Sequence, residues 1–515
     1  MTMRAHSTAH SAERTSRNLV ADLLRTAAYP GPQPEHVELR ETPISWVFLT
    51  EGDVYKIKKP VQFAFLDFST LDARRRACEA ELLLNTRLAT GAYFGLVPVR
   101  RGADGHLHFG PEGEVVDWAV HMLRLPDAFR GDVRLSAGTF LPAHIDALAV
   151  MLADFHARAR CDAATSDWGT LDAIGRNVRE NFAEVDPAKE RLLTIAQAYE
   201  VERWQHGFLH DRARAFDRRR LAGRIREGHG DLRLEHFFVG DEGELTIIDC
   251  IELGDRFRSA DVCADIAFLS MDLAAKGHVE LAERFLARYA RAADDYDLYS
   301  VVDFYEGYRA YVRGKVSALA ARQSTGALRA LALADARRHF ALSLSSGRRS
   351  LLAPMVVAVG GVIASGKSTI ADAIGDRLSA PVIEPAMTDR VYAEMMMRAS
   401  TVLESGRPVV LDAAFRSEPL RRAARDLASE HGVTFAFVEC RAQPEVCRER
   451  LRERDRETTA SDGRLAIFDA LRAGVDPATE LSPTERFVID TDRPLAETMA
   501  ALDEHLRMWP RGLTS

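Results

Sequence analysis

Hydrophobic and polar positions change their spacing along the N-terminal part of the chain. Residues 44–50 have strand character, residues 51–53 form a turn signal, and residues 54–58 resume the strand pattern, which together predict a β-hairpin. From 71 to 88, apolar residues recur at spacings of three and four, which predicts a helix. Residues 115–125 have strand character again. A small β-rich lobe is therefore expected first.

The middle of the chain is mainly helical in its pattern. Helical spacing extends from 142 to 222. A strand, a turn and a second strand follow between 236 and 249, and helical spacing then continues to 348. A larger helical lobe is therefore predicted after the β-rich lobe.

A second domain is predicted from the apolar run at 355–359, which leads directly into a glycine-rich segment and then a helix. Strands of this kind normally open a domain, so we place the boundary near Pro354. The predicted organisation is a disordered tail over 1–17, a first domain over 18–345, a linker over 346–354 and a second domain over 355–515.

Composition narrows the class of protein. A chain of 515 residues is expected to form two or three domains, and it contains no apolar run long enough to span a bilayer. None of the 6 cysteines forms a C-x-x-C pair, which favours a reducing, cytoplasmic location. The net charge of −8 argues against binding of long nucleic acids. We expect a small-molecule acceptor as partner and no membrane; the oligomeric state stays open.

The glycine-rich segment has the spacing of a phosphate-binding P-loop, from Gly361 to Ser368. Its backbone N–H groups are expected to face phosphate oxygens, Lys367 to reach the β- and γ-phosphates, and the Ser368 hydroxyl to bind Mg²⁺. The following helix directs the positive end of its dipole at the phosphates. The predicted nucleotide-binding residues here are Gly361, Ala364, Ser365, Gly366, Lys367, Ser368 and Thr369.

Two further features of the second domain are candidates for phosphoryl transfer. Asp412 ends an apolar run, and a carboxylate there would lie at the ligand edge of a parallel sheet, where it binds the metal's water shell or accepts a proton; the alternative is a helix N-cap. Arg450 and Arg454 lie one turn apart in an arginine-rich helix. They are expected either to clamp phosphate from a lid or to form a solvated face.

These motifs resemble the small P-loop kinases, a class that includes gluconate, shikimate and polynucleotide-end kinases. The resemblance covers 355–509. It implies nucleotide binding with a transferable phosphate. The sequence departs from that class over 380–390, where the segment is short and the usual acidic–basic pair is missing, so the acceptor is not defined.

The first domain carries a second constellation: His229-Gly230-Asp231, followed by an apolar run that ends at Asp249. Kinase-like phosphotransferases need one carboxylate near the acceptor hydroxyl and another on Mg²⁺. A loop aspartate followed by a hairpin with a second aspartate supplies both. An ordinary turn is the alternative.

This constellation resembles the aminoglycoside phosphotransferase family, and the stretches 44–50, 55–60, 65–71 and 261–269 resemble one bacterial branch in which such a domain is fused to a P-loop kinase-like (AAA family ATPase) domain. The resemblance implies a bilobal kinase-like fold (α+β) and then a P-loop α/β fold with a parallel sheet. It also implies Asp231 as catalytic base and Asp249 as principal metal ligand.

The resemblance further implies a lysine that pairs with the nucleotide phosphates, at Lys56 or Lys58, and a partner glutamate at Glu81 in preference to Glu79. The position that is Asn in that family is His236 here. Because Mg²⁺ prefers oxygen ligands, His236 either contacts the metal through water, or the site takes another cation, or a second metal is dispensable.

The sequence as a whole predicts an ATP-dependent phosphotransferase with catalytic residues Asp231 and Asp412 and metal ligands Asp249, His236 and Ser368. The cofactors are ATP, with GTP as the alternative, and Mg²⁺, with Mn²⁺ as the alternative. The rival hypotheses are a non-catalytic nucleotide-sensing or partner-binding regulator, and a nucleotide or nucleic-acid-end kinase that uses the P-loop domain.

Overall fold

A computed structural model of the chain describes residues 19–63, 66–344, 353–385, 391–457 and 464–505. The predicted tail at 1–17, most of the predicted linker and the residues immediately around Thr388 lie outside the described residues. Contacts between Cα atoms divide the chain into two units. The first unit comprises Met1–His144, Arg158–Trp168 and Ile225–Asp265; the second comprises Ile145–Ala157, Gly169–Arg224 and Ile266–Ser515.

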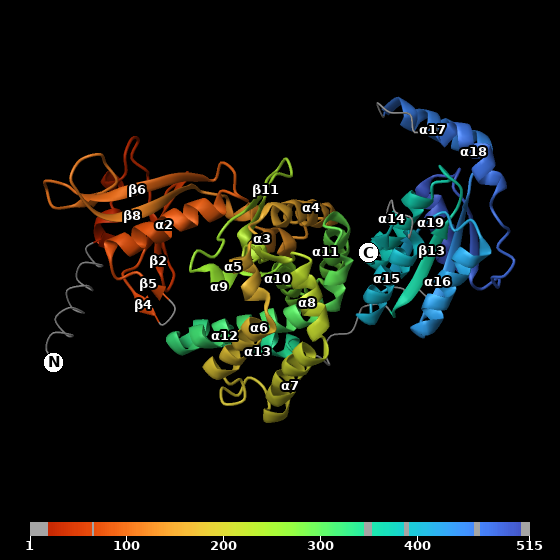
Figure 1. Ribbon diagram of the computed structural model, residues 1–515. Helices are drawn as coiled ribbons and strands as arrows, with labels where there is room; N and C mark the ends of the chain where they lie inside the picture. Colours follow the sequence, from red (N-terminus) through yellow and green to blue (C-terminus); the bar gives the residue numbers. More distant parts are fainter. Residues whose placement is uncertain (1–18, 64–65, 345–352, 386–390, 458–463, 506–515) are drawn as a thin grey trace. The chain divides into compact units, whose positions relative to one another are not determined.

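The first unit contains a six-stranded antiparallel sheet in the order β1-β2-β3-β8-β6-β7. The predicted hairpin, helix and strand near its centre are confirmed, with α2 packed along the sheet (Figure 1). Apolar side chains such as Phe48, Ile57 and Ala119 are fully buried in its core. The elements are β1 (Glu38–Glu41), β2 (Ser45–Leu49), β3 (Asp53–Lys58), β4 (Gln62–Phe63), β5 (Leu66–Asp67), α2 (Leu71–Asn85), β6 (Tyr93–Arg101), β7 (Leu107–His108), β8 (Glu114–Leu123) and α3 (Gly131–Ser136).

Two of the small strand pairs of the first unit flank the predicted catalytic loop in the sequence. β9 (Ile225–Glu227) pairs with β12 (Ser259–Asp261), and β10 (Phe237–Val239) pairs with β11 (Leu245–Ile247). The predicted strand–turn–strand is confirmed. The short helices are α5 (Ala163–Ser166) and α9 (Asp255–Arg258).

The second unit begins as a set of helices, as the apolar spacing predicted. Aromatic residues Phe304, Tyr305 and Tyr311 of α12 are buried among them rather than exposed to a ligand. The helices are α4 (Pro142–Arg158), α6 (Leu171–Glu184), α7 (Ile195–Asp211), α8 (Ala213–Leu221), α10 (Val262–Ala275), α11 (Val279–Ala292), α12 (Val302–Gln323) and α13 (Gly326–Leu342); α4 and α10 each extend over the boundary of the unit.

The same unit ends in a parallel sheet of five strands in the order β14-β15-β13-β16-β17. β13, the strand predicted to precede the P-loop, is buried along its whole length in the middle of the sheet, and helices flank it (Figure 1). The predicted fold class is confirmed. The elements are β13 (Met355–Gly360), α14 (Lys367–Leu378), β14 (Val382–Ile383), α15 (Val391–Glu404), β15 (Val409–Asp412), α16 (Glu418–Glu430), β16 (Thr434–Arg441), α17 (Pro444–Glu457), α18 (Arg464–Ala473), β17 (Arg486–Asp490) and α19 (Leu495–His505).

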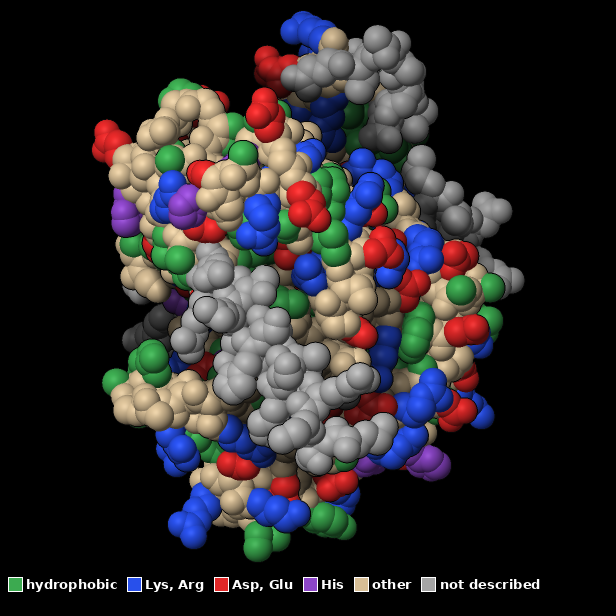
Figure 2. Space-filling model, turned by 90° about the vertical axis from the view of Figure 1, so that its left-hand side faces the viewer, with side chains coloured by type: hydrophobic (Ala, Val, Ile, Leu, Met, Phe, Trp, Pro, Cys, Tyr) green, Lys and Arg blue, Asp and Glu red, His purple; other side chains and the backbone are tan. Residues whose placement is uncertain are grey.

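Two surface properties bear on the expected partners. None of the helices among the described residues combines the length and the apolar character needed to cross a membrane. On the face shown in Figure 2, Lys and Arg side chains are interspersed with Asp and Glu side chains, which agrees with an overall charge of −8 that is spread over the sequence.

Candidate functional site

The centre of the first candidate site is an ion-paired lysine. Lys56 on β3 places its Nζ 2.8 Å from Glu81 Oε1 and 2.8 Å from Asp249 Oδ1. These three residues come from a strand, from α2 and from the segment after β11. The pair of a strand lysine with Glu81 was expected from the sequence, whereas the contact with Asp249 was not. An amine held between two carboxylates at the edge of a β-rich lobe is suited to bind phosphate oxygens.

The neighbouring lysine lies deeper. Lys58 Nζ is 2.6 Å from Glu81 Oε2 and also pairs with Glu252. Its side chain is 0% exposed, whereas that of Lys56 is 15% exposed. The sequence left open whether Lys56 or Lys58 faces the nucleotide phosphates. Both lysines contact Glu81, but of the two only Lys56 is accessible to solvent. Glu252 was not singled out from the sequence, because nothing local marks it.

The electrostatics keep this cluster ionised. The positive charge of Lys56 lowers the pKa of the Asp249 carboxyl far below its ordinary value, against the effect of burial. Burial alone would raise the pKa of Glu81, but Lys56 and Lys58 outweigh it and the pKa is lowered. Asp249 has a positive φ of 67°, a conformation that Asp tolerates better than most residues. Both carboxylates therefore stay charged at neutral pH.

The His-Gly-Asp loop is held by one buried carboxylate. Asp265 accepts hydrogen bonds from the backbone N–H of His229 at 2.6 Å and of Gly230 at 2.9 Å. Asp265 therefore ties this loop to the start of α10. The His229 ring is 0% exposed, and burial lowers its pKa to about 4. Gly230 has a φ of 89°, and a Cβ there would lie 2.8 Å from the Phe257 carbonyl oxygen, so the loop needs glycine.

Asp231, the predicted catalytic base, is held by an arginine within its own loop. Arg233 donates from Nε to Asp231 Oδ1 at 2.9 Å and from Nη2 to Oδ2 at 2.8 Å. Such a bidentate pair orients the carboxylate and withdraws charge from both oxygens. Asp231 is 24% exposed in its side chain, so a hydroxyl can approach it.

His236 occupies the position between Asp231 and Asp249. Its Nδ1 lies 2.7 Å from the Asp231 carbonyl oxygen, which assigns the proton to Nδ1 and makes Nε2 the acceptor of a hydrogen bond from Arg233. Nε2 is 3.3 Å from Arg233 Nη2 and 3.6 Å from Asp249 Oδ2. A nitrogen and a carboxylate oxygen therefore face the same point.

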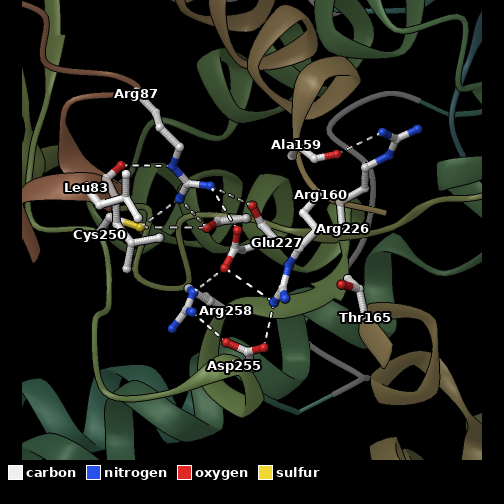
Figure 3. A network of polar contacts seen from close by, with 12 residues as sticks. Leu83, Arg87, Ala159, Arg160, Thr165, Arg226, Glu227, Cys250, Asp255 and Arg258 are labelled. Atoms are coloured by element: carbon white, nitrogen blue, oxygen red, sulfur yellow. Dashed lines mark hydrogen bonds and ion pairs between the residues drawn. The ribbon is translucent and has the colours of Figure 1, made fainter. Parts of the chain in front are cut away.

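A network behind the loop connects it to α2 (Figure 3). Arg87, just after α2, donates to the carbonyl oxygens of Glu227 at 3.3 Å and Gly228 at 3.4 Å, and to Cys250 Sγ at 3.4 Å. The Glu227 carboxylate in turn accepts from Arg258 at 2.9 Å. Arg87 therefore links the end of helix α2 to the residues before the His-Gly-Asp loop and to the segment after Asp249. The sequence carries no local signal for this network, because its members are far apart along the chain.

The P-loop has the backbone that phosphate binding requires. Ala364 has a φ of 62° and Gly366 a φ of 80°, both left-handed. A Cβ on Gly361 would lie 2.4 Å from Ser365 Oγ and 2.7 Å from the Cys440 carbonyl oxygen. The loop is closed from the far side by Thr491, whose Oγ1 donates to the Ser365 carbonyl oxygen at 2.6 Å. Thr491 was not identified from the sequence.

The loop faces the predicted carboxylate. Asp412 pairs in register opposite Val359 at the end of β15, next to the start of the loop. Burial raises the pKa of Asp412, while a hydrogen bond from Ser368 and the charge of Lys367 oppose this shift. Among the described residues, Asp412 Oδ1 is buried without a hydrogen-bond partner. Thr369, next to Ser368, is exposed.

The two predicted lid arginines lie on α17. Arg450 donates from Nη2 to the Thr491 carbonyl oxygen at 2.7 Å and from Nη1 to that of Ala364 at 3.3 Å. It therefore lies against the P-loop and braces it. Arg454 follows one turn later on the same helix. A role of either residue in clamping phosphate stays a prediction.

Two pairs of side chains could contribute to binding a divalent cation. Groups of three or more His, Cys, Asp or Glu side chains in metal-binding arrangement are not found among the described residues. Asp249 Oδ2 with His236 Nε2 offers one oxygen and one nitrogen, and Ser368 with the unpartnered Asp412 Oδ1 offers oxygens alone. The oxygen pair suits Mg²⁺, which usually takes its remaining ligands from phosphate and water, whereas the nitrogen–oxygen pair suits Mn²⁺ better.

Comparison with known proteins gives two kinds of match. Residues 356–478 match the family model described as "AAA domain". Uncharacterized proteins of Mycobacterium tuberculosis and Mycobacterium bovis are each 32% identical to this chain over an alignment of 451 residues, which covers 82% of this chain and 87% of the relative. The match therefore extends over both predicted domains.

Solved structures of lower similarity cover each half. A gluconokinase from Sinorhizobium meliloti 1021 is 24% identical and covers 32% of this chain and 95% of its own, with a TM-score of 0.24. The GDP complex of aminoglycoside 2′-phosphotransferase-IIIa is 16% identical and covers 63% of this chain and 98% of its own, with a TM-score of 0.39.

Proposed function

The chain belongs to the family of these mycobacterial proteins, and we propose that it is an ATP-dependent phosphotransferase with two nucleotide-binding sites and a small hydroxylated acceptor. The observation that carries the proposal is the position of Lys56, 2.8 Å from both Glu81 and Asp249. Binding of a nucleotide with its metal requires an accessible lysine for the phosphates and ionised carboxylates beside it, and Lys56 with its two partners provides both.

In the first site, each residue has a distinct part. Lys56 binds phosphate oxygens, and Glu81 keeps its ammonium group in place. Asp249 and His236 would hold a divalent ion, which would supply positive charge to the transferring phosphate. Asp231, oriented by Arg233, accepts the proton of the acceptor hydroxyl.

In the second site, the P-loop backbone and Lys367 bind the phosphates, and Ser368 and Asp412 lie where a divalent ion would be held. The buried, unpartnered Asp412 Oδ1 supports this assignment, because a buried carboxylate oxygen is costly unless something binds it. GTP is the alternative nucleotide and Mn²⁺ the alternative ion.

One observation favours a second candidate function for the first site. Arg233 engages both oxygens of Asp231, which weakens that carboxylate as a base. A site that binds nucleotide without transferring phosphate would have this arrangement. The chain would then act as a nucleotide-sensing regulator through that half.

The test is steady-state ATP turnover by the full chain with pools of small hydroxylated metabolites. With the P-loop site silenced by Lys367→Ala, we expect Asp231→Ala to lower the remaining turnover by at least a hundredfold, the ordinary range for a lost general base. Asp241→Ala, at an exposed position of the nearby turn, is the control. ATP turnover that is unchanged in Asp231→Ala would remove the catalytic assignment of the first site.

Lys367→Ala tests the second site separately. We expect it to abolish nucleotide binding at the P-loop, since a lysine there acts as a point charge on phosphate. Lys189→Ala, on an exposed side chain, is the control. Isothermal titration with ATP measures the number of sites, and two sites in Lys367→Ala would contradict the assignment.

A further inference from the structure

Helix α11 presents a row of arginines to the P-loop region within the second unit. Arg284, Arg288 and Arg291 follow spacings of four and three, so they share one face of the helix. Arg284 and Arg288 both pair with Asp376 of α14, the first at 2.9 Å. Arg291 reaches the part of α14 nearer the P-loop.

Arg291 holds two carboxylates. Its Nη1 is 2.5 Å from Asp372 Oδ1, and its Nη2 pairs with Glu384. The contact is anchored beside it by Tyr296, whose hydroxyl donates to the Val382 carbonyl oxygen at 2.8 Å. The end of β14 and the first half of α14 are thereby both attached to this helical segment.

Both carboxylates lie next to the P-loop site. Asp372 is four residues after Ser368 on α14, so the two side chains share a face of the helix. Ile383 pairs in register with Leu411, so Glu384 and Asp412 each follow directly at the same edge of the sheet. Adjacent parallel strands are about 4.8 Å apart, which brings Glu384 level with Asp412.

These carboxylates act electrostatically on the site. Burial is the main cause of the raised pKa of Asp412, and the negative charges of Glu384 and Asp372 add to it. Uncompensated, the same charges would repel the phosphates of a bound nucleotide. Arg291 is the cation that both of them contact.

We propose that Arg291, which lies outside the P-loop domain, is a positioning residue for the P-loop nucleotide site: it holds Asp372 and Glu384 and offsets their charge beside Ser368 and Asp412. This inference rests on the proposed binding of nucleotide at the P-loop. It means that the helical segment supplies a residue that the second site needs for full affinity.

If Arg291 only contributed to packing, its loss would have a different effect on ATP binding. Loss of packing would weaken metal-free ATP and Mg²⁺-bound ATP equally. Loss of a compensating charge weakens the more highly charged ligand more, because Coulomb energy is proportional to charge. Metal-free ATP carries about twice the negative charge of its Mg²⁺ complex, so the logarithm of the effect should be about twice as large.

The experiment is isothermal titration of the full chain with ATP in excess Mg²⁺ and with ATP in EDTA, counting only the binding that Lys367→Ala removes. Because the side chains of Arg291, Asp372 and Glu384 are 33%, 42% and 49% exposed, solvent screening limits the effect. We expect Arg291→Ala to weaken metal-free ATP about fivefold and Mg²⁺-bound ATP about twofold. Arg291→Lys should restore most of the loss.

Arg288→Ala is the matched control, since it removes an arginine of the same row whose partner lies another turn away from Ser368. It should leave the ratio of the two affinities unchanged. Equal ratios in Arg291→Ala and wild type, or the same shift in Arg288→Ala, would overturn the inference. Unchanged ATP binding in Lys367→Ala would instead overturn the proposed function of the P-loop, so the two failures are distinguishable.

Discussion

Lys56 and Lys58 show how two like residues on one strand acquire different roles. They are two positions apart on β3 and point to the same face, and both pair with Glu81. Lys56 keeps access to solvent and contacts Asp249, whereas Lys58 is fully buried against Glu252. At the residue scale, the two lysines differ in burial and in their second partner, Asp249 for one and Glu252 for the other. These differences distinguish a ligand-binding lysine from a supporting one.

The first residue-scale prediction concerns the metal. With the P-loop silenced by Lys367→Ala, we expect Asp249→Asn to remove metal-dependent ATP binding, because it replaces an ionised oxygen ligand. If His236 Nε2, which lies 3.6 Å from Asp249 Oδ2, exchanges its contact with Arg233 for the metal, Mn²⁺ should support binding at least as well as Mg²⁺, and His236→Asn should shift the preference towards Mg²⁺.

The measurement is ATP affinity across Mg²⁺ and Mn²⁺ titrations, with Asp241→Asn as the control on an exposed aspartate of the same hairpin. If His236→Asn leaves the metal preference alone, His236 only supports the loop. Full metal dependence in Asp249→Asn would place the metal elsewhere.

The second residue-scale prediction is a pH dependence. The pKa of His229 is about 4 in the folded chain, below its ordinary value of 6.5. Between these values the unfolded chain binds a proton that the folded chain does not, so stability falls as pH falls from about 6.5 to 4. In this window the free energy of unfolding falls by about 1 kcal/mol for each pH unit because of His229.

Urea unfolding at several pH values in this window measures the effect. His229→Gln should have a shallower dependence than wild type, while His106→Gln, at a half-exposed side chain, should follow wild type. Parallel curves for wild type and His229→Gln would show that His229 is not the titrating group.

At the scale of elements, the P-loop connects the central strand of its sheet to α14. Its conformation depends on positive φ at Gly361, Ala364 and Gly366. Only two of these are glycine. Ala364 adopts a left-handed conformation that costs about 1 kcal/mol for an L-residue, and the loop retains it because Arg450 and Thr491 brace the backbone around it.

This geometry makes opposite predictions for two small substitutions. Gly361→Ala adds a methyl group 2.7 Å from the Cys440 carbonyl oxygen and should cost about 1–3 kcal/mol of stability and lose ATP binding at the P-loop. Ala364→Gly relieves the strained φ at an entropic cost of similar size, so stability should change by less than about 1 kcal/mol. Thermal unfolding with and without ATP compares them; equal losses in both variants would contradict the loop geometry.

At the scale of the molecule, several ion pairs join the helical segment to the P-loop region. Arg407, just before β15, is 7% exposed in its side chain and pairs with Glu283 at 2.7 Å and Asp303 at 3.0 Å. Arg398 pairs with Asp294. An ionic interface of this kind lets two folded parts be stable separately and stabilise each other when joined.

We therefore predict that residues 18–345 and 355–515, expressed separately, each unfold cooperatively. The 355–515 fragment should melt at a lower temperature than the P-loop transition of the full chain, because Arg407 loses both carboxylates. Arg407→Ala should lower the melting temperature of the full chain but not that of the fragment. Absence of a cooperative melt in either fragment would show that the boundary near Pro354, or the independence of the halves, is wrong.

Local features of this chain could be read from the sequence because their signals lie within a few residues of each other. The strand before the P-loop, the glycines of the loop and the helix after it form one continuous segment, and the hairpin of β2 and β3 follows from alternation and a turn. The roles of Asp231 and Asp249 were inferred from their order in two motifs and stay predictions.

What only the tertiary structure decided are the pairings between distant residues. Lys56 meets Asp249 across 193 positions of sequence, Arg233 engages Asp231, and Arg291 reaches Asp372 from another part of the chain. Periodicity places a charge on a face of a strand or helix, but it does not say which opposite charge the fold brings to that face. The sequence therefore determined which residues could do chemistry, and packing determined which partners set their charge, depth and orientation.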